Sequence, residues 1–200
     1  MNNKILLLLL TLFISISLLF YVLNKQTKIE YDRIQKEKLE LKLAFIKLNK
    51  EINEQLADIS IQNIIIEDSL SKQHFLSDLI NWKPVLIYRY SELNCNTCYE
   101  TEIDLLHKLF AENKQRMIIL CSYKMKQYFL MFKRMNKILL PIYRIPQNSF
   151  SWEMEDYGSP YYFVLHPDMK ISHIFVTDKE YPELNKQYLE SVKRLLQDEN

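Results

Sequence analysis

Hydrophobic residues follow three different patterns along this chain of 200 residues, and each pattern predicts a different kind of segment. Residues 5–23 form an apolar run of 19 residues without a charge, which as a helix would span roughly 28 Å, close to the hydrocarbon thickness of a bilayer. Residues 29–59 are rich in Lys, Glu, Leu and Ile, and their apolar positions recur at a near-heptad spacing. From residue 61 onward, short apolar runs alternate with amphipathic stretches.

The first pattern predicts that residues 1–24 are a transmembrane anchor that is not cleaved. A cleaved signal peptide is the rival interpretation, but the apolar run is longer than usual and no small-x-small cleavage site follows it. The basic residues after the run favour a cytoplasmic C-terminal part by the positive-inside rule. The short head that carries Lys4, followed by an apolar run, has the layout of an export signal. We therefore expect a single-pass membrane protein with its globular domain on the periplasmic or extracellular side.

The second pattern predicts a helical spacer over residues 25–60. Lys38 and Gln55 interrupt the heptad seam, and further apolar residues widen the stripe beyond two positions. Such a helix either self-associates or packs on the domain. A stalk that holds the domain away from the bilayer is one interpretation, and a homodimeric coiled coil through residues 29–59 is the other.

The third pattern predicts an α/β domain over residues 61–200. Apolar and β-branched runs predict strands at 61–66, 84–90, 117–122, 139–145, 161–166 and 171–176. Helical spacing predicts helices at 70–80, 97–112, 124–136 and 183–196. This order describes a central mixed sheet with helices on both faces.

Composition excludes several classes of function. Gly158 is the only glycine, so neither a P-loop nor a dinucleotide fingerprint can be present, and we expect no cofactor. A net charge of +1 gives no reason to expect nucleic acid as a partner. Three cysteines are too few for a disulfide scaffold. We expect no metal site, because the four histidines show no paired ligand spacing.

Cys95 and Cys98 form the one pair with a recognisable chemistry. They lie between a predicted buried strand and an amphipathic helix, so Cys95 would face the unpaired N–H groups at the helix start, which favour the thiolate. Cys98 is about one helical turn further on and can reach the sulfur of Cys95. Cys95 would then attack a partner disulfide and Cys98 would resolve the mixed disulfide. Cys121, inside an apolar strand, is expected to be a buried and inert thiol.

Gly158, Ser159 and Pro160 run directly into a predicted strand and hairpin, and with them residues 61–196 resemble the thioredoxin-like family. The style is closest to membrane-anchored TlpA-type oxidoreductases. The resemblance implies that Pro160 is a cis-proline that packs beside the redox cysteines. It also implies that the backbone of Ser159 bonds to the extended chain of a substrate. An ordinary trans turn at Ser159 and Pro160 is the alternative.

The chain departs from the family at several positions around the cysteines. Asn94 stands where members usually carry Trp, and Asn96 and Thr97 replace the Gly-Pro pair of thioredoxins. A buried acid is common on the preceding strand, whereas residues 88–90 here read Tyr-Arg-Tyr. Glu92 is the nearest carboxylate, and it would either assist proton transfer or be a solvated loop residue.

Three functions follow from these residues. The first is a thiol-disulfide oxidoreductase that acts on the thiols and disulfides of exported proteins and is restored by a membrane-embedded or periplasmic electron donor. The second is a non-enzymatic thioredoxin-like binding module in which the pair is vestigial. The third, a peroxide-reducing relative, is the weakest, because Glu92 stands where those enzymes usually place a threonine.

Overall fold

The computed structural model describes residues 3–80, 82–94, 96–147, 149–150, 152 and 158–198, with the backbone alone for 3–9 and 96–100. It divides into two compact units, one up to Lys47 and one from Leu48 onward. Helix α1 (Asn3–Leu56) begins in the first unit, and its last turns belong to the second.

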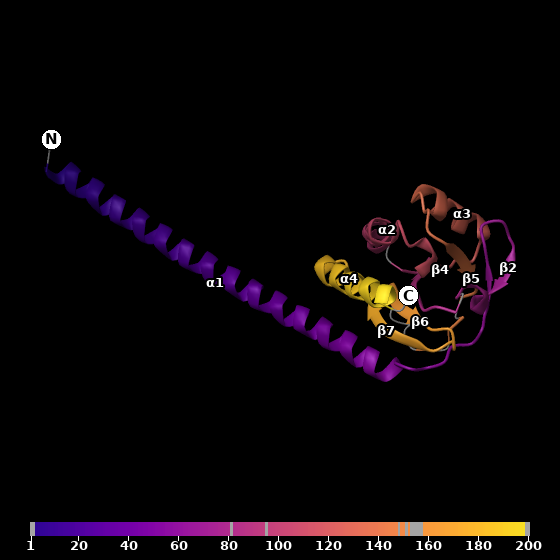
Figure 1. Cartoon of the computed structure of the whole chain (residues 1–200). Helices are drawn as coiled ribbons and strands as arrows, with labels where there is room; N and C mark the ends of the chain where they lie inside the picture. The colour runs from indigo at the N-terminus through magenta and orange to yellow at the C-terminus, as the bar shows by residue number, and fades with distance from the viewer. Residues whose placement is uncertain are drawn as a thin grey trace. The chain divides into compact units, whose positions relative to one another are not determined.

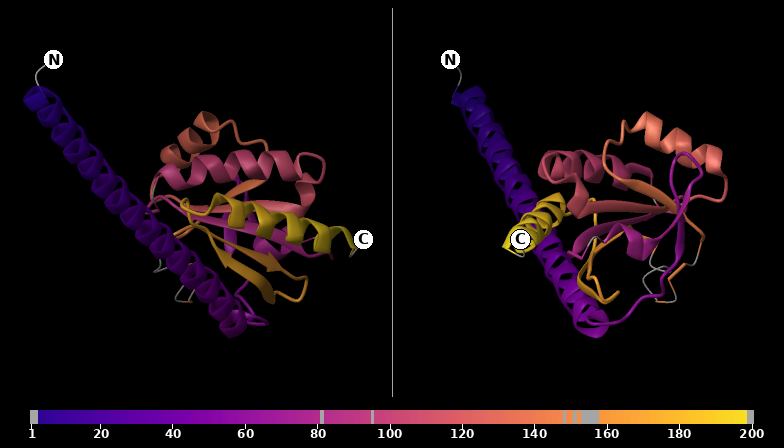
Figure 2. Two further views of the ribbon diagram at one scale, coloured as in Figure 1. Left: turned by 90° about the vertical axis from the view of Figure 1, so that its left-hand side faces the viewer. Right: turned by 45° about the vertical axis from the view of Figure 1, so that its right-hand side comes forward.

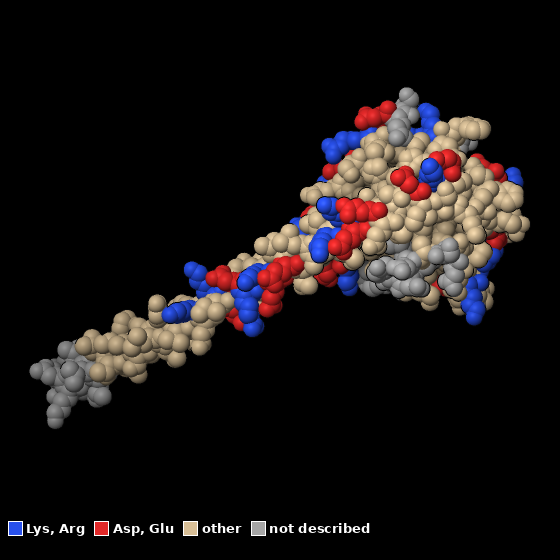
Figure 3. Space-filling model, turned by 90° about the horizontal axis from the view of Figure 1, so that it is seen from below, with Lys and Arg blue, Asp and Glu red and all other residues tan. Residues whose placement is uncertain are grey.

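The first unit is the greater part of α1, a single uninterrupted helix. Near its N-terminus α1 is long and apolar enough to cross a membrane, and none of this apolar stretch is buried. In Figure 3 the stretch of the helix that follows the grey residues shows no charged side chain, whereas Lys, Arg, Asp and Glu are interspersed further along. The predicted long apolar helix at the N-terminus is therefore confirmed.

The second unit is built on a seven-stranded mixed sheet in the order β2-β1-β5-β4-β3-β6-β7 (Figure 1). Strands β3, β4 and β5 are parallel, and β6 and β1 flank them in the antiparallel direction. The strands are β1 (Ile65–Glu67), β2 (Gln73–Phe75), β3 (Val85–Ser91), β4 (Met117–Ser122), β5 (Ile142–Ile145), β6 (Tyr161–Leu165) and β7 (Ile171–Val176). The helices are α2 (Asn96–Phe110), α3 (Lys126–Met135) and α4 (Pro182–Asp198), with short 3-10 turns at Leu76–Leu79 and Lys114–Arg116.

Alternating side chains of the central strands fill two hydrophobic cores, one on each face of the sheet. Helices α2, α3 and α4 cover the first core, into which Tyr88, Ile119 and Tyr162 point (Figure 2). The second core contains Ile87, Phe163 and other strand residues, and it is closed by Ile52 of α1, the 3-10 turn at Leu76–Leu79 and Phe150. Because β3, β4 and β6 are buried on both faces, they have continuous apolar runs rather than alternating ones.

The end of α1 covers the outer edge of β7. Asn49 and Asn53 lie one turn apart, and their side-chain oxygens accept hydrogen bonds from the N–H groups of Val176 (2.7 Å) and Ile174 (2.8 Å). Ile52 between them is buried. The compact unit begins at Leu48, inside the predicted spacer of residues 25–60. For this part of the spacer, packing on the domain is the arrangement found.

The sequence prediction failed mainly at residues 70–80, which form β2 and one 3-10 turn in place of the predicted α-helix. Asp68 accepts hydrogen bonds at Oδ1 from the N–H groups of Leu70 (2.8 Å) and Lys72 (2.9 Å), which closes a turn. The chain then returns as β2, antiparallel to β1. Local Asp bonding of this kind competes with helix formation. The other predicted helices, and the strands from residue 84 onward, are confirmed with small shifts of their ends, whereas the first strand is confined to Ile65–Glu67.

We predict that Asn49→Ala lowers the free energy of unfolding by about 1–3 kcal/mol, because the buried N–H of Val176 loses its acceptor. Urea unfolding of the full chain in detergent, followed by fluorescence, measures this change. Lys50→Ala removes an exposed side chain on the same helical turn and should change stability by less than about 0.5 kcal/mol. Equal effects of the two substitutions would show that the hydrogen bond from Val176 to Asn49 does not stabilise the domain.

Candidate functional site

A tight turn shapes the loop that leads from β3 into α2. The N–H of Ser91 donates to Asn94 Oδ1 (2.6 Å), and the N–H of Asn94 donates back to the Ser91 carbonyl (2.9 Å). The side-chain oxygen of Asn94 thus closes the turn by accepting the Ser91 N–H. The Trp that is usual in the family could not make this hydrogen bond, because an indole N–H can only donate. The turn directs the chain from the central strand into the first turn of α2.

The two cysteines of the predicted pair follow this turn. Cys95 lies outside the described residues, and Cys98 is described by its backbone alone, within the first turn of α2. The backbone arrangement is a buried strand, a turn and then a helix of 15 residues whose N-terminus follows Cys95 directly. The unpaired N–H groups of such a terminus stabilise a thiolate in this position.

Glu92 connects the loops that follow the three parallel strands. Its Oε1 accepts hydrogen bonds from the N–H of Lys124 (2.7 Å) and from Gln147 Nε2 (3.2 Å), and its own N–H donates to the Ser122 carbonyl (3.0 Å). The half-buried carboxylate therefore fixes the loop between β3 and α2, which we call the redox loop after the predicted cysteine pair, to the ends of β4 and β5. This arrangement gives Glu92 a structural function, in addition to the acid or base role considered from the sequence.

Ser159 and Pro160 lie at the same edge of the sheet as this loop. Strand β6 runs antiparallel to β3 with Tyr161 opposite Arg89, so the residues just before β6 lie beside the carboxyl end of β3. Pro160 is buried, and its carbonyl accepts hydrogen bonds from both the N–H and the hydroxyl of Thr177 (2.9 Å each).

The expected cis-proline is wrong. No described peptide bond is cis, and this includes the bond between Ser159 and Pro160. The trans isomer is the intrinsically favoured form of an X-Pro bond. Gly158 takes a positive φ of 65° just before it, where an L side chain would be strained, and this turns the chain into β6 without a cis bond.

A buried arginine occupies the strand position where the family usually places a buried acid. Arg89 is only 2% exposed, and its Nη2 donates to Ser122 Oγ (2.6 Å) while Nη1 donates to the Tyr90 carbonyl. Because Ser122 also bonds to the backbone of Glu92, the guanidinium lies next to the residues that hold the redox loop. At this strand position, Arg89 therefore carries a positive charge where the family usually has a negatively charged residue.

The buried acid is instead Glu102, on the opposite face of the sheet. It is 3% exposed, and its two oxygens accept hydrogen bonds from the Tyr162 hydroxyl (2.5 Å) and Asn185 Nδ2 (2.6 Å). Burial raises the pKa of Glu102, although both hydrogen bonds act in the opposite direction. Burial and the charge of Glu102 together raise the pKa of Tyr162 well above its ordinary value.

Sequence reasoning missed Glu102, although a signal was present. Glu102 precedes Ile103 and lies four residues before Leu106, so it falls on the apolar stripe of α2 rather than on its polar face. It also follows Cys98 by four residues, which places the two positions on one side of the helix. A charged residue inside an apolar stripe beside a redox motif is the pattern that would have identified it.

Cys121 is fully buried in β4, as predicted for an inert thiol. Burial raises its pKa far above the ordinary range, and its Sγ contacts the Tyr143 carbonyl (3.4 Å). The described residues hold no group of three or more His, Cys, Asp and Glu side chains that could bind a metal ion.

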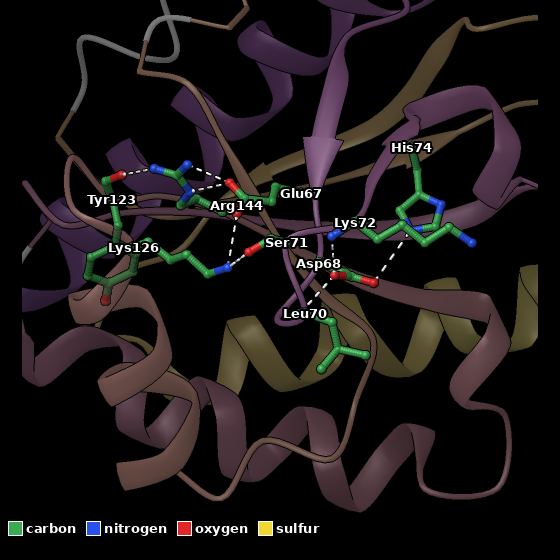
Figure 4. Close-up of polar contacts among 9 residues, drawn as sticks. All are labelled: Glu67, Asp68, Leu70, Ser71, Lys72, His74, Tyr123, Lys126 and Arg144. Carbon is green, nitrogen blue, oxygen red and sulfur yellow. Dashed lines mark hydrogen bonds and ion pairs between the residues drawn. The ribbon is translucent and has the colours of Figure 1, made fainter.

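An ion-pair network and a cavity lie beyond Glu92 at the same edge. Glu67 on β1 is paired with Arg144 on β5 (2.5 Å) and with Lys126 on α3 (3.3 Å), and its pKa is lowered chiefly by the Arg144 hydrogen bond (Figure 4). A cavity of about 480 Å³ opens beside it, lined by residues of β1, β2, β5 and the loop segments at Lys124 and Gln147 that Glu92 holds.

Comparison with solved structures identifies the fold. A proposed protein disulfide isomerase from Bacteroides thetaiotaomicron superposes with a TM-score of 0.54 at 17% identity, over 70% of this chain and 90% of that protein. The fold is thioredoxin-like. A thiol:disulfide interchange protein from Bacteroides sp. (TM-score 0.51, 15% identity, 67% and 90% coverage) and the peroxidoxin BcpB of Mycobacterium tuberculosis (0.51, 16%, 68% and 97%) share it. No protein-family model and no curated protein sequence matches the chain.

The thioredoxin-like domain thus contains a buried carboxyl whose titration should appear in its stability. Because the folded-state pKa of Glu102 is raised, its protonated form stabilises the fold at low pH. That stabilisation is lost as the pH rises from the ordinary glutamate pKa of about 4.3 through the raised pKa of the folded state. We predict that the stability of Glu102→Gln relative to the wild type increases over this range.

Unfolding free energies of the full chain measured from acid to neutral pH test this prediction. The amide of Glu102→Gln retains both contacts, since it can donate to the Tyr162 hydroxyl and accept from Asn185. Glu112→Gln, at an exposed position just after α2, reports the pH dependence common to the whole chain. A difference between wild type and Glu102→Gln that stays constant with pH would show that Glu102 does not titrate with a raised pKa.

Proposed function

We propose that this protein is a thiol-disulfide oxidoreductase that acts on exported proteins through Cys95 and Cys98, and that α1 anchors it to a membrane. The observation that carries the proposal is the position of the Cys-x-x-Cys motif in a thioredoxin-like fold. The motif lies at the end of the central strand β3 and at the N-terminus of α2. Pro160, at the start of the neighbouring strand β6, lies at the same edge of the sheet.

The reaction consists of two exchanges. The Cys95 thiolate attacks one sulfur of a substrate disulfide, a new bond joins Cys95 to that sulfur, and the other substrate sulfur leaves as a thiolate that takes a proton. Cys98 then attacks the sulfur of Cys95, the mixed disulfide breaks, and the second substrate thiol leaves. The substrate is reduced by two electrons and the enzyme pair is oxidised, so a thiol donor must restore it.

Within this proposal Glu102 accepts the proton that Cys98 loses. It lies on the side of α2 that Cys98 shares by its four-residue spacing, and its carboxyl is buried between Tyr162 and Asn185. A carboxyl with a raised pKa is a better proton acceptor at neutral pH than an ordinary glutamate. After the exchange, the proton would pass to the departing substrate thiolate.

Reduction of insulin disulfides by dithiothreitol, with the full chain in detergent as catalyst, tests the redox function. We predict that Cys95→Ser abolishes the catalysed rate. We predict that Cys98→Ser, reduced and then mixed with insulin after dithiothreitol is removed, accumulates a mixed disulfide with the substrate, because the resolving thiol is missing. The mixed disulfide is visible as a band on a non-reducing gel.

Cys121→Ala is the matched control, since this thiol is buried away from substrate, and it should keep the wild-type rate. A wild-type chain no more active than Cys95→Ser would contradict the enzyme and favour the binding module. The same variants assayed with hydrogen peroxide distinguish the third hypothesis, for which peroxide consumption would exceed insulin reduction.

Labelling of intact cells with a membrane-impermeant maleimide tests the compartment. We predict that the reduced wild-type chain is labelled, because the domain is exported. The variant with both Cys95→Ser and Cys98→Ser should stay unlabelled, since it retains only the buried Cys121. Labelling of the wild type only after the cells are permeabilised would place the domain in the cytoplasm.

A further inference from the structure

One region of the domain combines basic and exposed apolar side chains. Residues 113–152 carry eight Lys and Arg residues and no Asp or Glu, in a chain whose net charge is only +1. Helix α3 lies in the middle of this region. Its inner side is fixed to the sheet by the buried rings of Phe129 and Phe132.

The outer side of α3 carries apolar residues that no other part of the domain covers. We use the term α3 surface for this side together with the exposed leucines next to it. Leu139, just after the helix, is 72% exposed and Met135 is 71% exposed. The apolar members are Leu70, Tyr128, Leu130, Met131, Met135 and Leu139, all of them exposed.

Leu70 belongs to this surface because two lysines of α3 bind the residues on either side of it. Lys133 Nζ donates to Ser69 Oγ (2.9 Å), and Lys126 Nζ donates to Ser71 Oγ. The turn between β1 and β2 is thereby held against α3, as Figure 4 shows for Lys126 and Ser71. Leu70 at the tip of the turn is 86% exposed.

Basic side chains surround these apolar tips. Lys126 and Arg144 are engaged with Glu67, and the half-buried Lys133 is engaged with Ser69, so the exposed basic residues are Lys124, Arg134 and Lys137. Leucine, methionine and tyrosine tips among lysines and arginines are the composition of a helix that lies in a membrane interface. There, the basic groups bind lipid phosphates while the apolar tips enter the boundary of the acyl chains.

We propose that the α3 surface binds the surface of a bilayer that contains anionic lipids. Two observations favour lipid over a soluble partner protein. The absence of acidic residues from the whole of 113–152 gives charge complementarity to a uniformly anionic surface. The same chain also carries a helix able to cross a membrane, so a bilayer is the surface that this domain meets most often.

Fluorescence quenching by brominated lipids tests the proposal with the full chain reconstituted in vesicles. Met135→Trp introduces a reporter at the most exposed methionine of α3, and Lys179→Trp introduces one in the exposed loop before α4. The parent chain already contains Trp82 and Trp152, whose fluorescence can also be quenched. The quantity compared is therefore the quenching of each variant minus the quenching of the parent chain. Vesicles of brominated phosphatidylcholine are compared with and without phosphatidylglycerol.

We expect excess quenching for Met135→Trp in vesicles with phosphatidylglycerol, and none for Lys179→Trp. Charge reversal at Lys133, Arg134 and Lys137 to Glu, added to Met135→Trp, should abolish the excess, while unchanged circular dichroism shows that the variant folds. Equal quenching of the two reporters, or quenching insensitive to phosphatidylglycerol and to charge reversal, would overturn the proposal. So would crosslinking at this surface to a second copy or to another protein. The readout does not involve Cys95, so the outcome is independent of the redox function.

Discussion

The arrangement of the whole site depends on how the central strand β3 is paired. β3 is parallel to β4 on one side and antiparallel to β6 on the other. The parallel neighbour brings the ends of β3, β4 and β5 to one edge, where Glu92 fixes their loops together. The antiparallel neighbour brings the start of β6, with Pro160, to that same edge. The N-terminus of α2 and the buried Pro160 therefore lie at one edge because of strand pairing.

Two buried ionisable side chains, Arg89 and Glu102, lie on opposite faces of the sheet near this edge, and they differ in the charge states that they can adopt. Arg89 contributes a positive charge and hydrogen bonds to Ser122 and to the Tyr90 carbonyl. Glu102 can hold either charge state, and its burial favours the neutral one. In the usual family arrangement an acid occupies the strand position. Here strand β3 carries the cationic Arg89, and the buried acid, Glu102, lies on α2, the helix that bears Cys98.

Sequence alone predicts most of this fold, because the central strands are buried on both faces and so appear as unbroken apolar runs. Residues 117–122 match β4 at both ends. The failures have non-local or side-chain causes. Residues 70–80 have helical spacing, but Asp68 closes a turn with the N–H groups of Leu70 and Lys72, and pairing of β2 with β1 decides the outcome. The burial of Glu102 depends on Tyr162 and Asn185, which are 60 and 83 residues away in the chain. The apolar stripe of α2 indicates that Glu102 is buried, but no local pattern identifies these distant partners.

The α3 surface and the redox edge are fixed relative to each other, because both belong to one compact unit. α3 begins at Lys126, shortly after β4 ends at Ser122, and the intervening Lys124 N–H is bound by Glu92. A lipid contact along α3 would therefore determine the direction in which the redox edge faces. The contact need not be strong. On a chain anchored as proposed, a second membrane signal acts at the high local concentration that the anchor provides, so a few exposed leucine and methionine side chains and exposed basic residues suffice. An anchor alone sets the distance over which a domain can search, whereas an anchor with a surface contact also sets the orientation of the domain. The proposed disulfide exchange takes place at one edge of the domain, so its rate depends on that orientation.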